Sequence, residues 1–172
     1  MVTGGQGGAA RSIDEILGEA RARLCRLGPQ EARAAMASGA VLVDIRPQAQ
    51  RAAQGVVPGA LHVERNVLEW RFDPRSPARL PQASYHLRVI VMCVEGYTSS
   101  LAAASLHDLG VAGATDLAGG FRAWQRAGLP VVTVPGGPGS VAPGSVLPGS
   151  VAPGSVAPGS VAPGSVAPVR AT

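Results

Sequence analysis

The chain has 172 residues and a formal net charge of +4, and 46% of its residues are hydrophobic although only 3% are aromatic. This length suits one domain, and an apolar share made largely of Ala and Val supports a modest core. The basic residues are mixed with 11 acidic ones and no aromatic platform lies between them, which argues against a nucleic-acid-binding protein.

The sequence predicts a cytoplasmic protein that makes no contact with a membrane. Residues 1–11 are Gly-rich, and we expect them to be disordered, without the basic start and apolar stretch of a secretory signal. No apolar run approaches the roughly 18 residues of a membrane span. Cys25 and Cys93 lack both CxxC spacing and His residues at zinc-ligand spacing, so we expect free thiols, no metal and no cofactor.

Two helices are predicted in the first 40 residues. Ser12 begins an S-x-x-E pattern, which is typical of a capping box, and predicts a helix that runs over residues 12–27 with Leu27 near its end. Gly28 and Pro29 stop that helix and start a second one, since proline suits the first helical position. The second helix is expected to continue through Ala37.

Strands and helices alternate through the rest of the folded part. Short apolar runs rich in β-branched residues predict strands at 41–44, 61–63, 89–92 and 114–117. Apolar residues at helical spacing predict helices over 98–109 and 121–127, each closed by a glycine. This alternation indicates an α/β fold with a mainly parallel central sheet.

The C-terminal residues have a composition that cannot build a core. No charged residue occurs from Gly136 to Val169, where Ser-Val-Ala-Pro-Gly repeats with a period of five and Leu147 replaces Ala once. We therefore expect residues 135–172 to form a disordered tail. Its repeat resembles elastin-like pentapeptides. Two alternatives for the tail therefore stay open: a segment that self-associates, or a spacer that has no function of its own.

Residues 89–101 carry the pattern with the clearest chemical meaning. A buried strand ends at Cys93, and a short loop containing Gly96 leads into a helix that starts near Thr98. Backbone N–H groups of such a loop, together with the helix N-terminus, favour a thiolate, which is the nucleophilic form of cysteine. The hydroxyls of Thr98, Ser99 and Ser100 are placed to donate to the sulfur or to cap the helix.

Four motifs in order resemble those of the rhodanese superfamily. Residues 93–99, Cys-Val-Glu-Gly-Tyr-Thr-Ser, resemble its six-residue active-site loop, and 42–46 resemble its first core strand. Residues 55–63 resemble its G-H-I-P-G-A turn, with Val56 in place of His, and 116–124 resemble its closing L-x-G-G-[FW]-x-x-W signature. The resemblance implies a rhodanese-like three-layer fold, with helices on both faces of the sheet, over residues 28–134.

The resemblance implies a sulfurtransferase whose catalytic residue is Cys93. In that family the cysteine takes a sulfane sulfur from a donor such as thiosulfate or a mercapto acid, holds it as a persulfide and passes it to a thiophilic acceptor. Arg51 and Arg65 follow core strands at positions where related domains place anion-binding groups. The active-site loop that would bind the substrate comprises Val94, Glu95, Gly96, Tyr97, Thr98 and Ser99.

Details of the loop separate several activities. Thr98 matches the thiosulfate and mercaptopyruvate sulfurtransferases, whereas related phosphatases have a loop one residue longer that ends in Arg, so phosphatase activity is not favoured. The thiosulfate enzymes have basic residues where this chain has Val94 and Glu95, and Glu95 is expected to repel the thiosulfate dianion.

Two alternatives to a sulfurtransferase of small molecules stay open. One is a rhodanese-like binding or regulatory module that recognises a protein partner, and the other is a carrier that delivers persulfide to a protein or small thiol. A relay role for Cys25 is not favoured. Asp44 and Arg46 are expected to be structural. Trp70 and Trp124 are expected to pack in the core, with the mouth of the site as the alternative for Trp70.

Overall fold

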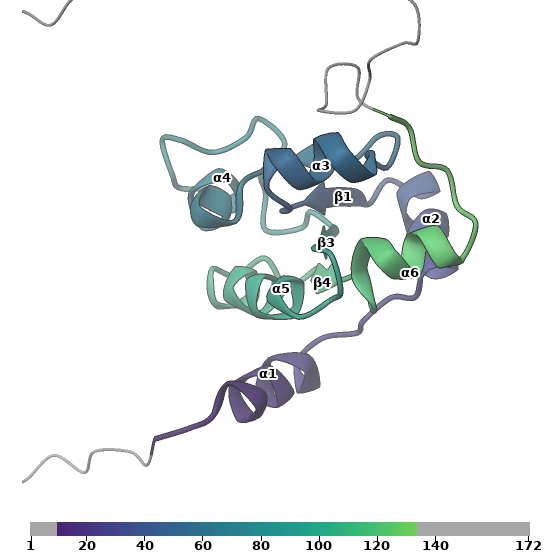
Figure 1. Ribbon diagram of the computed structural model, residues 1–172. Helices are drawn as coiled ribbons and strands as arrows, with labels where there is room; N and C mark the ends of the chain where they lie inside the picture. Colours follow the sequence, from purple (N-terminus) through teal and green to yellow (C-terminus); the bar gives the residue numbers. More distant parts are fainter. Residues whose placement is uncertain (1–9, 134–172) are drawn as a thin grey trace, which may run out of the picture. The chain divides into compact units, whose positions relative to one another are not determined.

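The structure is a computed structural model that describes residues 10–133. The expected tail over 135–172 and all but the last two residues of the expected disordered N-terminus over 1–11 lie outside the described residues. The elements, labelled in Figure 1 where space allows, are α1 Ile13–Ala22, α2 Pro29–Ala37, β1 Val41–Asp44, α3 Gln48–Gln54, β2 Leu61–His62, the 3₁₀ helix η1 Arg65–Val67, α4 Leu68–Phe72, β3 Val89–Met92, α5 Thr98–Asp108, β4 Ala114–Asp116 and α6 Gly120–Arg126. None of the helices in this described part is long and apolar enough to cross a membrane.

The four strands form one parallel sheet in the order β2-β1-β3-β4. β1 and β3 are central, and their register pairs Val43 with Val91 and Asp44 with Met92. The predicted parallel α/β fold is therefore confirmed. All four strands end at the same edge of the sheet, which is where open α/β sheets bind their ligands.

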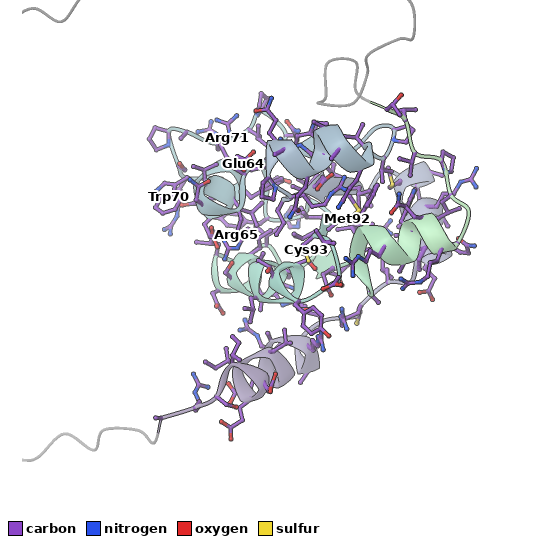
Figure 2. The ribbon with its side chains drawn as sticks, in the orientation of Figure 1. Glu64, Arg65, Trp70, Arg71, Met92 and Cys93 are labelled. Carbon is purple, nitrogen blue, oxygen red and sulfur yellow. The ribbon has the colours of Figure 1, made fainter. Side chains whose placement is uncertain are left out.

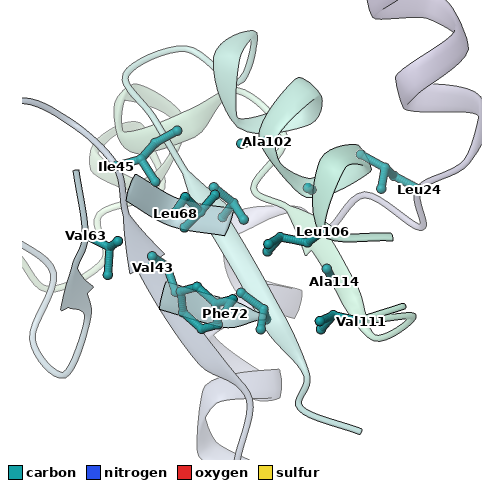
Figure 3. Packing of buried hydrophobic residues seen from close by; sticks show 13 residues of the cluster. Leu24, Val43, Ile45, Val63, Leu68, Phe72, Ala102, Leu106, Val111 and Ala114 are labelled. Atoms are coloured by element: carbon teal, nitrogen blue, oxygen red, sulfur yellow. The ribbon is translucent and has the colours of Figure 1, made fainter. Parts of the chain in front are cut away.

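Helices cover both faces of the sheet, and this explains the continuous apolar run of β3. Val89 and Val91 point into one buried cluster, which α4 and α5 complete with side chains such as Phe72 and Leu106 (Figure 3). The alternate residues Ile90 and Met92 point into a second cluster, with Ala32 of α2 and with Phe121 and Trp124 of α6. A strand buried on both faces needs apolar residues at every position.

The first helix begins as predicted but ends earlier. The Ser12 hydroxyl accepts a hydrogen bond from the Glu15 N–H at 3.2 Å, so the capping box is confirmed. The expectation that the helix runs to Leu27 is wrong, because α1 ends at Ala22. Leu27 instead pairs with the chain just after β4: its N–H donates to the Asp116 carbonyl, and its own carbonyl accepts from the Ala118 N–H at 2.8 Å.

The two tryptophans differ in their surroundings. Trp124 is only 2% exposed in the second cluster, as predicted, and its indole N–H donates to the Pro130 carbonyl at 2.9 Å. The prediction for Trp70 is wrong, because this side chain is 61% exposed. The short helix α4 buries Leu68 and Phe72, which lie four residues apart on one face, so Trp70 between them lies on the opposite face.

Candidate active site

Cys93 lies where β3 ends, and a tight loop joins it to α5. Figure 2 shows Cys93 next to Met92, between α5 and α6. The loop turns at Gly96, whose φ of +80° is a conformation that side chains other than glycine rarely adopt. The turn brings the Gly96 N–H to 3.2 Å from the Cys93 sulfur, to which it donates a hydrogen bond.

The first turn of α6 binds two loop carbonyls from behind. The Phe121 N–H donates to the Cys93 carbonyl at 2.9 Å, and the Arg122 N–H donates to the Val94 carbonyl at 3.0 Å. These donors have no partners within their own helix, so the loop satisfies them. In a planar trans peptide the N–H points opposite to the carbonyl. Since α6 binds the carbonyls of Cys93 and Val94, the N–H groups of Val94 and Glu95 point away from α6, toward the cavity that these two residues line.

Glycine at the start of α6 allows this helix to approach the loop so closely. Gly119 and Gly120 both have positive φ, at +73° and +59°. A Cβ atom on Gly120 would lie 2.6 Å from the carbonyl oxygens of Cys93 and Val94, too close for any side chain. Gly120 of the closing motif is therefore required by the loop that surrounds the cysteine, whereas a Cβ atom on Gly119 would meet Ala123 of α6, 2.7 Å away.

Behind the cysteine lies a buried network of hydroxyls and one carboxylate. The Cys93 thiol donates to the Ser99 hydroxyl oxygen at 3.2 Å, and Ser99 in turn donates to Asp116 at 3.2 Å. Ser100 donates to the same carboxylate at 2.8 Å, and Arg26 binds both of its oxygens, at 2.8 and 3.1 Å. Asp116 is fully buried, and these partners compensate its charge.

In front of the cysteine an open cavity of about 550 Å³ reaches the solvent. This volume lies in the range of small-molecule sites and greatly exceeds that of a thiosulfate ion. Three segments line it: the residues after β1, the residues around η1, and the active-site loop. They contribute Ile45, Arg46, Pro47 and Gln50, then Glu64, Arg65 and Asn66, then Cys93, Val94, Glu95, Tyr97 and Thr98.

The two predicted anion-binding arginines are both engaged by carboxylates. Arg65 lines the cavity, and its guanidinium lies 2.9 Å from Glu69, one turn along the chain. Arg51 is not among the lining residues; it donates to the Arg46 carbonyl and lies 3.3 Å from Glu64 at the cavity wall. The structure therefore places Arg65 at the cavity. Arg51 lies behind Glu64, one of the residues that line the cavity.

The carboxylate of Glu95 also has a cationic partner. Arg122 of α6 forms an ion pair with it at the entrance of the loop. The repulsion of anions expected from Glu95 is thus reduced by a residue that sequence reasoning missed. The two residues are 27 positions apart, and no local pattern in the sequence joins them.

Asp44 and Arg46 form a fully buried ion pair at the end of β1, in agreement with the structural role predicted for them. The guanidinium lies 2.7 Å from the carboxylate, donates to the Gly55 carbonyl at 2.9 Å and stacks 3.6 Å from the ring centre of Phe121. The pair therefore joins β1 to α6, next to the cysteine loop. Cys25, by contrast, is an exposed thiol beyond the end of α1, and both cysteines are free.

Comparisons with known proteins identify the family of this fold. The family model of the rhodanese-like domain matches residues 28–127. The chain is 37% identical to thiosulfate sulfurtransferase GlpE of Pseudomonas fluorescens over 101 residues, 58% of this chain and 84% of the relative. It is 34% identical to a sulfurtransferase of Allochromatium vinosum over 96 residues, 56% of this chain and 81% of that relative.

A solved structure from Rhodopseudomonas palustris, of a protein of unknown function described as a possible tyrosine phosphatase, superposes with a TM-score of 0.66. It is 32% identical and covers 75% of this chain and all of that one. Thiosulfate sulfurtransferase from Pseudomonas aeruginosa shares the fold with a TM-score of 0.56 and 24% identity, over 69% of this chain and 22% of that one. With its family match, its cysteine loop and its paired glycines, the chain belongs to the rhodanese-like domain family.

Proposed function

We propose that this protein is a sulfurtransferase that carries sulfane sulfur as a persulfide on Cys93. The observation that carries the proposal is the loop geometry: the Gly96 N–H donates to the sulfur while α6 binds the carbonyls of Cys93 and Val94 from behind. A backbone N–H group aimed at the sulfur in this way stabilises an anion without a charged side chain. The relatives named as sulfurtransferases support the same chemistry.

The reaction proceeds in two displacements. In the first, the Cys93 thiolate attacks the outer sulfur of thiosulfate; an S–S bond forms, the donor's S–S bond breaks, and sulfite leaves with the electron pair. In the second, the acceptor, cyanide or a thiolate, attacks the outer sulfur of the persulfide and releases the Cys93 thiolate. The loop N–H groups stabilise the negative charge in both steps.

Phosphatase activity fits the cavity less well. Phosphate binding in such loops needs a free guanidinium, and the loop has Thr98 where it turns into α5. The two arginines that line the cavity are already bound, Arg46 by Asp44 and Arg65 by Glu69. The tyrosine phosphatase activity named as possible for the protein from Rhodopseudomonas palustris is therefore not expected of this chain.

The first experiment is intact-mass analysis after incubation with thiosulfate or with 3-mercaptopyruvate. We expect one added sulfur, about 32 Da, on the wild type and on Cys25→Ala but not on Cys93→Ala, because only Cys93 has an activating loop. Cyanide or a thiol should then remove the added mass.

Folding of each variant is checked by circular dichroism. The absence of an adduct on folded wild-type protein with both donors would contradict the proposal. That result would instead favour the binding module, and a partner protein would then be sought.

The ion pair at the entrance gives a second prediction, on donor preference. Glu95→Gln should raise kcat/KM for thiosulfate about two- to fivefold at low salt, and Arg122→Gln should lower it by a similar factor, since Arg122 compensates Glu95. Both effects should be smaller for the singly charged 3-mercaptopyruvate and should decrease with added salt.

Steady-state kinetics with both donors at two salt concentrations test this prediction. The control is Arg33→Gln, because Arg33 lies on α2 and does not line the cavity. If Glu95→Gln or Arg122→Gln changes kcat/KM equally for the two donors, charge at the entrance does not select the donor.

A further inference from the structure

Two arginines that precede the family domain reach the back of the active-site loop. The family match begins at residue 28, whereas Arg21 lies in the last turn of α1 and Arg26 lies between α1 and α2. Their guanidinium groups both donate to the Gly96 carbonyl, at 2.9 and 3.1 Å. We refer to residues 13–27 as the N-terminal segment.

Backbone contacts on both sides fix the position of Arg26. The Cys25 carbonyl accepts from the Thr115 hydroxyl at 2.8 Å, and Leu27 pairs with the backbone at the end of β4. The side chain is only 23% exposed and is held by both oxygens of the buried Asp116. Arg26 is therefore an ordered part of the site.

Arg21 is held by contacts with α5 and with the loop. α1 packs on α5 and buries Leu17 and Ala20. The Arg21 guanidinium donates to the Ser100 hydroxyl at 3.3 Å and lies 5.2 Å from the ring centre of Tyr97. Contacts with a hydroxyl, a carbonyl and an aromatic face leave this side chain a single arrangement.

These contacts determine the orientation of one peptide group. The Gly96 carbonyl accepts from the guanidinium groups of Arg21 and Arg26, both on the side away from the cavity. In a trans peptide the N–H of the next residue points in the opposite direction, so the Tyr97 N–H points toward the cavity that Tyr97 lines. Cationic donors on a carbonyl also polarise its peptide and strengthen the N–H as a donor.

We propose that Arg21 and Arg26 are positioning residues that hold the Gly96-Tyr97 peptide so that its N–H binds the outer sulfur of the Cys93 persulfide. This inference rests on the proposed function. The Gly96 N–H already donates a hydrogen bond to the sulfur of Cys93 itself. The outer sulfur of the persulfide lies one S–S bond further out, so it needs a second hydrogen-bond donor. The N-terminal segment is then a part of the active site that the family domain alone does not contain.

Neither arginine lines the cavity, and this separates a positioning role from substrate binding. We expect Arg21→Gln to lower kcat with thiosulfate about tenfold and to leave KM within about twofold, because it weakens an interaction made after the donor has bound. Arg26→Gln should act in the same direction. Arg26→Lys, which keeps the charge, should recover part of the loss.

The matched control is Arg23→Gln in the same segment. Arg23 pairs with the exposed Asp108 and makes no contact with the loop, so its kcat and KM should equal those of the wild type. Because Arg26→Gln leaves the buried Asp116 without its cation, its stability must be measured alongside by urea unfolding. Arg21→Gln removes no partner of a buried carboxylate and tests the proposal on its own.

The outcomes distinguish this inference from the proposed function. A wild type that forms no persulfide contradicts the proposed function itself. If the wild type turns over and Arg21→Gln matches Arg23→Gln in kcat, the positioning role is overturned while the sulfurtransferase stands. A rise in KM with unchanged kcat overturns it as well, because that pattern belongs to a residue that binds the donor directly.

Discussion

Gly96→Ala is expected to lower sulfur transfer by at least about 100-fold, because it changes the position of the N–H groups around the sulfur. The φ of +80° at Gly96 is one that alanine rarely adopts. In addition, a Cβ atom would lie 2.8 Å from the Gly119 nitrogen and 3.1 Å from the Leu117 carbonyl oxygen. Both are backbone atoms, so the loop and not its neighbour must move.

Gly39→Ala is the matched control for this experiment. Gly39 has a similar φ of +88°, but no atom lies within 4 Å of the position of its Cβ. It therefore has the same backbone strain without the collision, and we expect a loss of about 1 kcal/mol in stability and full activity. Thiosulfate:cyanide turnover and urea unfolding of both variants provide the comparison. Equal activities of the two variants would show that sulfur transfer does not depend on the geometry of the loop at Gly96.

Asp44→Ala is expected to lower the free energy of unfolding by about 3–5 kcal/mol, since it leaves the fully buried guanidinium of Arg46 without its counter-charge. Arg46 is also held in its buried position, because it donates to the Gly55 carbonyl and stacks on Phe121. Urea unfolding measures the loss.

A surface pair provides the control for this second experiment. Asp108→Ala removes the partner of Arg23, and because both of these side chains are about half exposed or more, the change should stay within about 1 kcal/mol. The double variant Asp44→Leu with Arg46→Met removes both buried charges and should recover much of the stability. A double variant no more stable than Asp44→Ala would show that the lost charge is not the cause.

The strands and the cysteine loop could be predicted because their causes are local. β3 is a continuous apolar run, since both of its faces are covered, and Cys93 follows it directly. The capping residue Ser12 and the helix-starting Pro29 are likewise defined by a few neighbours in the sequence. Fold class, helix starts and the position of Cys93 at the end of β3 all follow from such short patterns.

The partners of the loop could not be predicted, because their contacts span long separations. Arg21 and Arg26 lie 75 and 70 residues from Gly96, and in the sequence both look like ordinary helical surface residues. The same reason explains the wrong end of α1: the pairing of Leu27 with the end of β4 outweighs the helical spacing of its side chain. Only the folded chain brings these groups together.

The pairing of Leu27 with the end of β4 also determines an order of events during synthesis. The N-terminal segment is the first of the described elements to leave the ribosome, yet the groups that hold it, at Thr115, Asp116 and Ala118, are made about 90 residues later. The apolar residues of α1 likewise lack a partner surface until α5 has been made, and closing so long a loop is slow. The N-terminal segment is therefore expected to dock only after the chain has been made beyond residue 118.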